Sequence, residues 1–92
     1  MKIEQVNQDH KGYFKASEND KEAGRMTYTW TGTDRIIIDH TEVSPDFRGR
    51  NVGDELLMGA VTFARENNIK IIPLCPFARA VFDKKKELAD VL

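Results

Sequence analysis

The sequence predicts a mixed α/β fold: a mostly antiparallel sheet of about five strands with two to three helices. Two observations support this prediction. The first half of the chain alternates apolar and polar residues with the period of two that is typical of strands, and polar turns separate the runs. The second half changes to a helical period over residues 52–66 and then gives a short apolar run at residues 70–74. At 92 residues we expect a single domain, 1–92.

Four antiparallel strands are expected in the first half. The predicted ranges are 2–7 as an edge strand, then 12–17, 23–31 and 35–44, with a polar hairpin loop at 18–22. In the third strand Met26, Tyr28 and Trp30 share one face. The fourth is apolar on both faces, as expected of a central strand. Regular alternation would place Ile36, Ile38 and His40 on one face and Ile37, Thr41 and Val43 on the other.

The second half predicts a helix, a strand and a second helix. Asn51 is a suitable N-cap for the first helix, and Asp54 and Glu55 in its first turn suit the helix dipole. A strand–helix–strand order permits parallel pairing of 70–74 with 35–44 through a right-handed crossover. Pro73 predicts that one side of this last strand is not fully paired. Pro76 fits the first position of a short helix, and residues 87–92 remain ambiguous.

Composition excludes several classes of partner. The net charge is −1, so no general field attracts nucleic acid or an anionic membrane, and we expect neither as a partner. A single cysteine, Cys75, rules out a disulfide framework, argues against a thiolate metal site and fits a cytoplasmic location. No segment reads as a signal peptide or a membrane span. We expect a monomer or a weak homodimer.

The most informative stretch runs from Val43 to Gly53 and reads V-S-P-D-F-R-G-R-N-V-G. A strand enters a glycine-containing turn and a helix leaves it, which is the arrangement of an anion site. Arg48 and Arg50 add local positive charge. From the residues alone, a plain turn with two solvated arginines is an equally good interpretation.

This stretch, with H-T-E-V and L-C-P-F-A-R-A-V-F on either side, resembles the acetyl-CoA signature of the GNAT superfamily of N-acetyltransferases. The resemblance is to a minimal, single-domain branch. The signature is Arg/Gln-x-x-Gly-x-Gly/Ala preceded by Val-x-Pro, and the matching residues are Val43, Pro45, Arg48, Gly49 and Gly53. Asn51 replaces the middle glycine, and asparagine tolerates a left-handed backbone better than most residues.

The resemblance implies an N-acetyltransferase that moves an acetyl group from acetyl-CoA to an unidentified primary amine, either a small molecule or a peptide lysine. The alternative is a non-catalytic acyl-CoA-binding or protein-interaction module that kept the fold. Acetyl-CoA is implied as the cosubstrate, with no metal. The implied CoA-binding residues are Val43, Arg48, Gly49, Arg50, Asn51, Val52, Gly53, Asp54, Phe77 and Arg79.

The implied catalytic residues are His40, Glu42 and Cys75. The resemblance implies that the pantetheine arm passes between strands 35–44 and 70–74, where a backbone N–H at or beside Val43 would polarise the thioester. Histidine titrates near neutral pH, so His40 is a candidate base with Glu42 as its partner; a half-buried structural histidine is the alternative. Cys75, before the Pro76 helix, could accept the acetyl group, line the pocket, or serve as a small buried hydrophobe.

Overall fold

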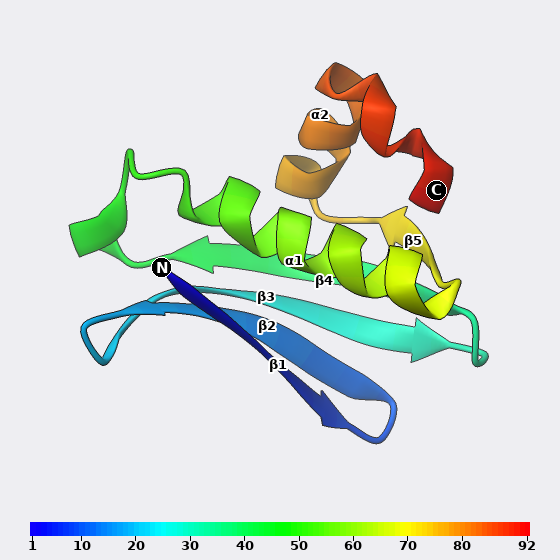
Figure 1. The fold of residues 1–92 in the computed structure, drawn as a ribbon, viewed down its shortest axis with the longest axis horizontal. Helices are drawn as coiled ribbons and strands as arrows, with labels where there is room; N and C mark the ends of the chain where they lie inside the picture. The colour runs from blue at the N-terminus through cyan, green and yellow to red at the C-terminus, as the bar shows by residue number, and fades with distance from the viewer.

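The computed structural model describes all 92 residues and has two layers, a five-stranded sheet and a set of helices that covers one of its faces (Figure 1). The strands follow one another in the order β1-β2-β3-β4-β5; the first four are antiparallel and β5 is parallel to β4. The predicted fold class is confirmed. The elements are β1 (Lys2–Gln8), β2 (Lys11–Glu18), β3 (Lys21–Thr31), β4 (Arg35–Val43), the 3-10 helix η1 (Pro45–Phe47), α1 (Val52–Asn67), β5 (Lys70–Pro73), α2 (Pro76–Lys84) and the 3-10 helix η2 (Lys86–Val91).

The first two hairpin turns are tighter than expected. Asp9, Asn19 and Asp20 have positive φ angles of 57°, 52° and 66°. Asparagine and aspartate reach this left-handed region at low cost, and such turns match the twist of the strands that they join. The predicted loop at 18–22 therefore shrinks to two residues between β2 and β3.

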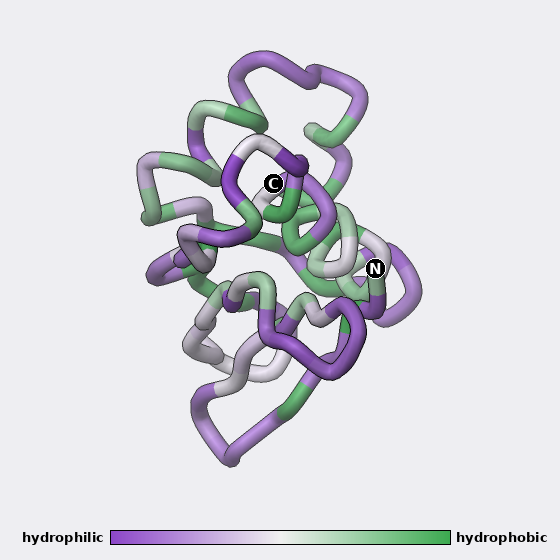
Figure 2. The backbone as a smooth tube through the Cα atoms, turned by 90° about the vertical axis from the view of Figure 1, so that its left-hand side faces the viewer, coloured by the Kyte–Doolittle hydropathy of each residue, from purple (hydrophilic) through white to green (hydrophobic).

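The core lies between the sheet and α1. One apolar face of helix α1 packs against the sheet. Alternate side chains of β2, β3 and β4 point toward the helix and complete the core. Figure 2 shows hydrophilic stretches of the backbone at the outer turns. The fully buried side chains include Met26, Tyr28, Ile36, Ile38, Leu56, Leu57, Val61 and Ile71. No helix covers the opposite face of the sheet, called the outer face below (Figure 1).

The C-terminal residues, ambiguous in the sequence, form η2 and pack back on the domain. Leu88 and Val91 are buried. The Arg65 guanidinium donates two hydrogen bonds to the Asp90 carboxylate, at 2.9 and 3.0 Å, and Lys70 Nζ donates to the Asp90 carbonyl at 2.6 Å. These contacts join η2 to both ends of the α1–β5 connection.

Strand β4 contains a β-bulge at Asp39. Ile38 lies opposite Tyr28 of β3, whereas His40 lies opposite Thr27, so Asp39 is one extra residue on β4. Because two residues on β4 then oppose one on β3, the alternation of side chains restarts after the bulge.

The bulge makes the predicted faces of β4 wrong beyond Ile38. Regular alternation would group His40 with Ile36 and Ile38. In the structure His40 projects from the outer face, and Thr41 and Val43 project toward the helices, where they line a pocket with α1.

Candidate active site

Strands β4 and β5 separate at their carboxyl ends. Their parallel ladder ends at the pair Ile38–Pro73. Beyond that pair the Leu74 N–H turns back to the Ile72 carbonyl at 3.1 Å, and the Cys75 N–H donates to the Ile38 carbonyl at 3.0 Å. Residues 40–43 of β4 therefore have no strand beside them on this edge. As predicted from Pro73, β5 is paired on one side only.

The backbone N–H of Val43 points into this opening. Val43 is paired with Gly24, and the next residue, Ser44, donates its N–H to the Ala23 carbonyl of β3 at 2.8 Å. Successive N–H groups in an antiparallel ladder point to opposite sides of the strand. The Val43 N–H therefore points away from β3, into the opening, where it can donate to a carbonyl oxygen.

A pocket of about 350 Å³ lies on the helix side of the opening and is called the helix-side pocket below. The end of β4, the turn before α1, the first turn of α1 and one residue of α2 form its wall. The structure brings all of the predicted CoA-binding residues together here except Arg50 and Arg79. Its lining residues are Thr41, Val43, Phe47, Arg48, Gly49, Asn51, Val52, Gly53, Asp54 and Phe77.

The turn leaves the start of α1 free of side-chain caps. Gly49 and Asn51 have φ angles of 77° and 59°, in the left-handed region. Asn51 is the N-cap residue, as predicted, but its side chain makes no capping hydrogen bond. The first intrahelical bond runs from the Glu55 N–H to the Asn51 carbonyl at 3.0 Å. The N–H groups of residues 52–54 are therefore available to an anion at the positive end of the helix dipole.

Gly53 and Phe77 form the contact between α1 and α2. A Cβ atom on Gly53 would lie 2.6 Å from Cζ of Phe77. Gly53 thus makes room for an aromatic ring. The Phe77 ring is 37% exposed and forms an apolar wall of the helix-side pocket.

The three predicted arginines occupy different positions. Arg48 lines the helix-side pocket. Arg50 pairs with Glu18 of the β2–β3 hairpin at 2.5 Å and lies over the Phe47 ring at 5.1 Å. Arg79 is exposed on α2 and lines none of the pockets described here. Arg48 is therefore the cation of this pocket.

Cys75 is the N-cap residue of α2, in agreement with its predicted position at a helix N-terminus. It is 4% exposed. Its Sγ accepts the Ala78 N–H at 3.4 Å and shares a hydrogen bond with the Thr41 hydroxyl at 3.4 Å. The sequence did not single out Thr41, because the bulge that turns it toward the thiol is not visible in a regular alternation.

His40 and Glu42 share one face of β4, as expected of residues two apart, and this is the outer face, opposite Ile36 and Ile38. Both are exposed. No hydrogen bond joins the two side chains, and Glu42 lies opposite Arg25 of β3. The expected orienting contact between the two residues is therefore not formed.

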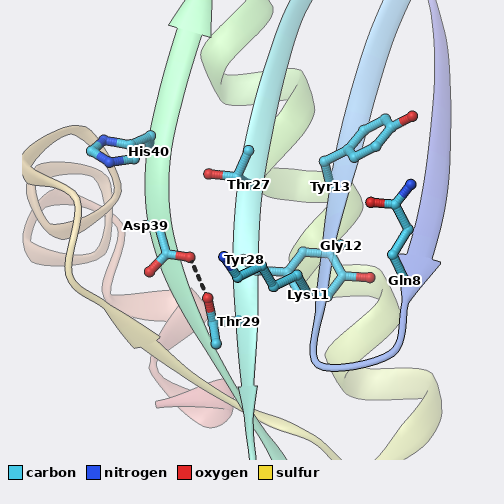
Figure 3. Close-up of a pocket in the computed structure, with 9 residues that line it drawn as sticks. All are labelled: Gln8, Lys11, Gly12, Tyr13, Thr27, Tyr28, Thr29, Asp39 and His40. Atoms are coloured by element: carbon cyan, nitrogen blue, oxygen red, sulfur yellow. Dashed lines mark hydrogen bonds between the residues drawn. The ribbon is translucent and has the colours of Figure 1, made fainter.

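A second pocket, of about 480 Å³, lies on the outer face over β2, β3 and β4 and is called the outer pocket below (Figure 3). Asp39 accepts a hydrogen bond from the Thr29 hydroxyl at 2.7 Å on its floor. His40 points to the side of β4 away from β3, toward the opening (Figure 3). Apart from His40, none of the residues of this pocket was predicted from the sequence to belong to a site. Its lining residues are Gln8, Lys11, Gly12, Tyr13, Thr27, Tyr28, Thr29, Asp39 and His40.

Nowhere do three or more histidine, cysteine, aspartate or glutamate side chains come together in a way that would hold a metal ion. None of the helices combines the length and the apolar character needed to cross a bilayer.

The comparisons with known proteins place this layered fold, with its opening between β4 and β5 and its turn before α1, among the acetyltransferases. Residues 13–91 match the sequence model of the family described as GCN5-related N-acetyl-transferase. The chain therefore belongs to the GCN5-related N-acetyltransferase family, which confirms the resemblance seen in the sequence.

Solved structures share this fold. A GCN5-like protein of Staphylococcus aureus, assigned as an N-acetyltransferase, is 36% identical with a TM-score of 0.70; the match covers 96% of this chain and 85% of that one. A ribosomal-protein-alanine N-acetyltransferase of Brucella melitensis biovar Abortus 2308 is 18% identical, with a TM-score of 0.72 and coverage of 84% and 62%. An aminoglycoside N-acetyltransferase in complex with CoA is 16% identical, with a TM-score of 0.63 and coverage of 90% and 88%. No curated protein sequence matches the chain.

Proposed function

We propose that the protein is an acetyl-CoA-dependent N-acetyltransferase that acetylates a primary amine. One observation carries this proposal: His40 and Thr41 are neighbours at the open edge of β4, yet they line pockets on opposite faces of the sheet. The opening between β4 and β5 thus lies between a pocket suited to CoA and a pocket that an amine can enter from the other side.

The helix-side pocket supplies the groups that a pyrophosphate needs. The N–H groups of residues 52–54, the helix dipole and Arg48 all favour an anion there. Phe77 offers an apolar surface to the pantetheine arm. The aminoglycoside N-acetyltransferase of the same fold that was solved with CoA supports the same cosubstrate.

The opening contains a hydrogen-bond donor for the thioester carbonyl. With the acetyl group in the opening, the Val43 N–H donates to the thioester oxygen and stabilises the charge that develops on it. The nitrogen of the neutral amine attacks the carbonyl carbon. A C–N bond forms, the C–S bond breaks, and CoA leaves as a thiolate that takes up a proton.

His40 accepts the proton that the amine loses. An alkylamine is a cation at neutral pH and must lose one proton before attack and a second after it. His40 lies on the outer face beside the opening, where an incoming amine passes (Figure 3). Glu42, two residues further on the same face, is the second candidate for this role.

Cys75 lines the opening in this proposal, and the acetyl group passes directly to the amine. The thiol is buried, and its sulfur already has two hydrogen-bond partners, the Ala78 N–H and the Thr41 hydroxyl. Intact mass after incubation with acetyl-CoA separates the alternatives. A stable acetyl adduct that disappears in Cys75→Ala would replace direct transfer by a covalent intermediate.

The test combines binding with turnover. Amide shifts on addition of CoA are expected at residues 48–54. Release of free thiol is expected with at least one primary amine from a panel of polyamines, aminoglycosides and lysine peptides. His40→Ala and Glu42→Gln are matched variants. Substitution of the residue that takes the proton is expected to lower kcat and to leave the Kd of CoA unchanged. Absence of shifts at the turn would overturn the CoA site.

Acyl-CoA binding without turnover is the second candidate function. The lack of an orienting hydrogen bond on His40 favours it. It predicts the same amide shifts and no thiol release with any amine.

A further inference from the structure

The outer pocket carries two opposite charges that are not paired with each other. Lys11 of β2 and Asp39 of β4 both line it. The three ion pairs of the structure involve neither residue. The Asp39 carboxylate accepts one hydrogen bond, from the Thr29 hydroxyl at 2.7 Å, which fixes its orientation.

The two charges lie on either side of the same strand. Lys11 is paired with Thr29 of β3, and Asp39 accepts a hydrogen bond from Thr29 on the β4 side, so the two charged residues flank Thr29 from opposite sides. In Figure 3 the Lys11 side chain reaches across β3 toward the Asp39 side of the pocket. An ammonium and a carboxylate on either side of one residue are complementary to an α-amino acid group. The ammonium of the protein can bind the carboxylate of the ligand, and the carboxylate of the protein can bind the ammonium of the ligand.

A second cation on the outer face, Arg25 of β3, is already occupied. Arg25 bonds to Glu22 through both Nε and Nη2, at 3.2 and 2.8 Å, and lies 4.1 Å from the centroid of the Tyr13 ring. Lys11 is therefore the cation that the outer pocket offers to a ligand.

The distance to the opening sets the length of the ligand. An amino acid group over Thr29 on β3 has to reach across β4 to its free edge, about one to one and a half strand spacings, or roughly 5–7 Å. An extended chain covers roughly 3.3–3.6 Å for every three bonds, so the four or five bonds from Cα to the terminal nitrogen of ornithine or lysine span about 5–6 Å.

We infer that the acceptor is a free diamino acid of the ornithine or lysine type. This inference rests on the proposed function, whose acceptor it names. Asp39 binds the α-ammonium group, Lys11 binds the α-carboxylate, and the side-chain amine reaches His40 and the opening. The α-ammonium stays protonated on Asp39, which directs acetylation to the side-chain nitrogen.

The test measures thiol release with four acceptors: lysine, ornithine, cadaverine and Nα-acetyl-lysinamide. Cadaverine lacks the carboxylate, and the blocked lysine lacks both charges and resembles a residue inside a peptide. We expect kcat/KM for lysine or ornithine to exceed that of the other two by about tenfold or more, as expected for one charge-assisted hydrogen bond. Equal or better use of Nα-acetyl-lysinamide would overturn the inference and leave the proposed function intact.

Variants of the two charges provide a second readout. Asp39→Asn and Lys11→Gln are each expected to raise KM for lysine about tenfold with kcat little changed. Lys11→Gln should leave cadaverine unaffected. Lys15→Gln, on the same face of β2 and outside the pocket, is the matched control.

If no amine is acetylated, binding of free lysine tests the inference about the acceptor. Free lysine is then titrated into the CoA-saturated protein, and amide shifts are expected at residues 11, 29 and 39. Their absence would overturn the inference. Turnover failure with intact CoA shifts at residues 48–54 would instead overturn the proposed activity.

Discussion

The Phe77 ring occupies the space that a side chain on Gly53 would need, with Cζ 2.6 Å from the position of a Cβ atom. This contact joins the first turn of α1 to the first turn of α2 at the wall of the helix-side pocket. Any side chain at position 53 has to displace the ring.

Gly53→Val is expected to raise the Kd of CoA about tenfold or more, because the displaced ring changes the pocket wall. Isothermal titration measures the affinity, and thermal unfolding shows whether the fold survives. Gly59→Ala is the matched control: it lies in the same helix but faces Ile3, at 3.0 Å, so CoA affinity should not change. A Gly53→Val protein with normal CoA affinity would contradict the assignment of this pocket.

His40→Ala is expected to lower kcat by about a hundredfold, the usual contribution of a general base, with the Kd of CoA changed less than twofold. The physical reason is that His40 faces the outer pocket and has no place in the helix-side pocket. Steady-state kinetics and a CoA titration separate the two effects. Equal losses of binding and turnover would show that the roles of the two faces are assigned incorrectly.

Ionisation of Tyr28 is expected to lower the stability of the folded protein at high pH. Burial raises the pKa of Tyr28, and a hydrogen bond from Gln5 opposes the shift. Because the folded pKa lies above the unfolded value of about 10, stability is complete below pH 10 and falls as the pH rises toward the folded pKa. Urea unfolding from pH 8 to 11 measures the slope.

Tyr28→Phe should be less stable at neutral pH, because the hydroxyl also donates to Asn7 Oδ1, but it should lose this part of the pH dependence. Tyr13→Phe serves as the comparison and should retain the slope. The assignment fails if both variants keep the slope of the parent protein.

Protonation of Asp90 in acid is expected to weaken the contact between η2 and Arg65 of α1. The hydrogen bonds from Arg65 lower the pKa of the Asp90 carboxyl. The stabilising contribution is therefore present above the unfolded pKa of about 3.9 and is lost as the pH falls through the folded value. Hydrogen exchange at Leu88 and Leu92 should be faster in Asp90→Asn at neutral pH. Glu87→Gln removes a charge that bonds to nothing here, and its exchange should match the parent protein.

Much of the fold could be predicted from the sequence. The strand order, the crossover helix and the parallel β5 follow from periodicity and from turn residues that punctuate the chain. The turn before α1 was also predicted, because its conformation depends on local residues: Gly49 and Asn51 adopt the left-handed backbone that these types tolerate.

The faces of β4 could not be predicted by regular alternation. One signal was present: the side chains facing the helices are Ile36, Ile38, Thr41 and Val43, with a step of three where every other step is two. Arg50 illustrates a different limit. Its partner, Glu18, lies 32 residues away, and only the folded hairpin brings the two together.

Asp39 is the one residue of β4 that a regular ladder with β3 would not hold. Without it, His40 would directly follow Ile38 opposite Thr27, and both His40 and Thr41 would keep their present faces. The extra residue therefore adds a carboxylate to the outer pocket without changing the faces of the side chains on either side of it. In an alignment with a relative whose strand lacks the bulge, the gap belongs opposite Asp39.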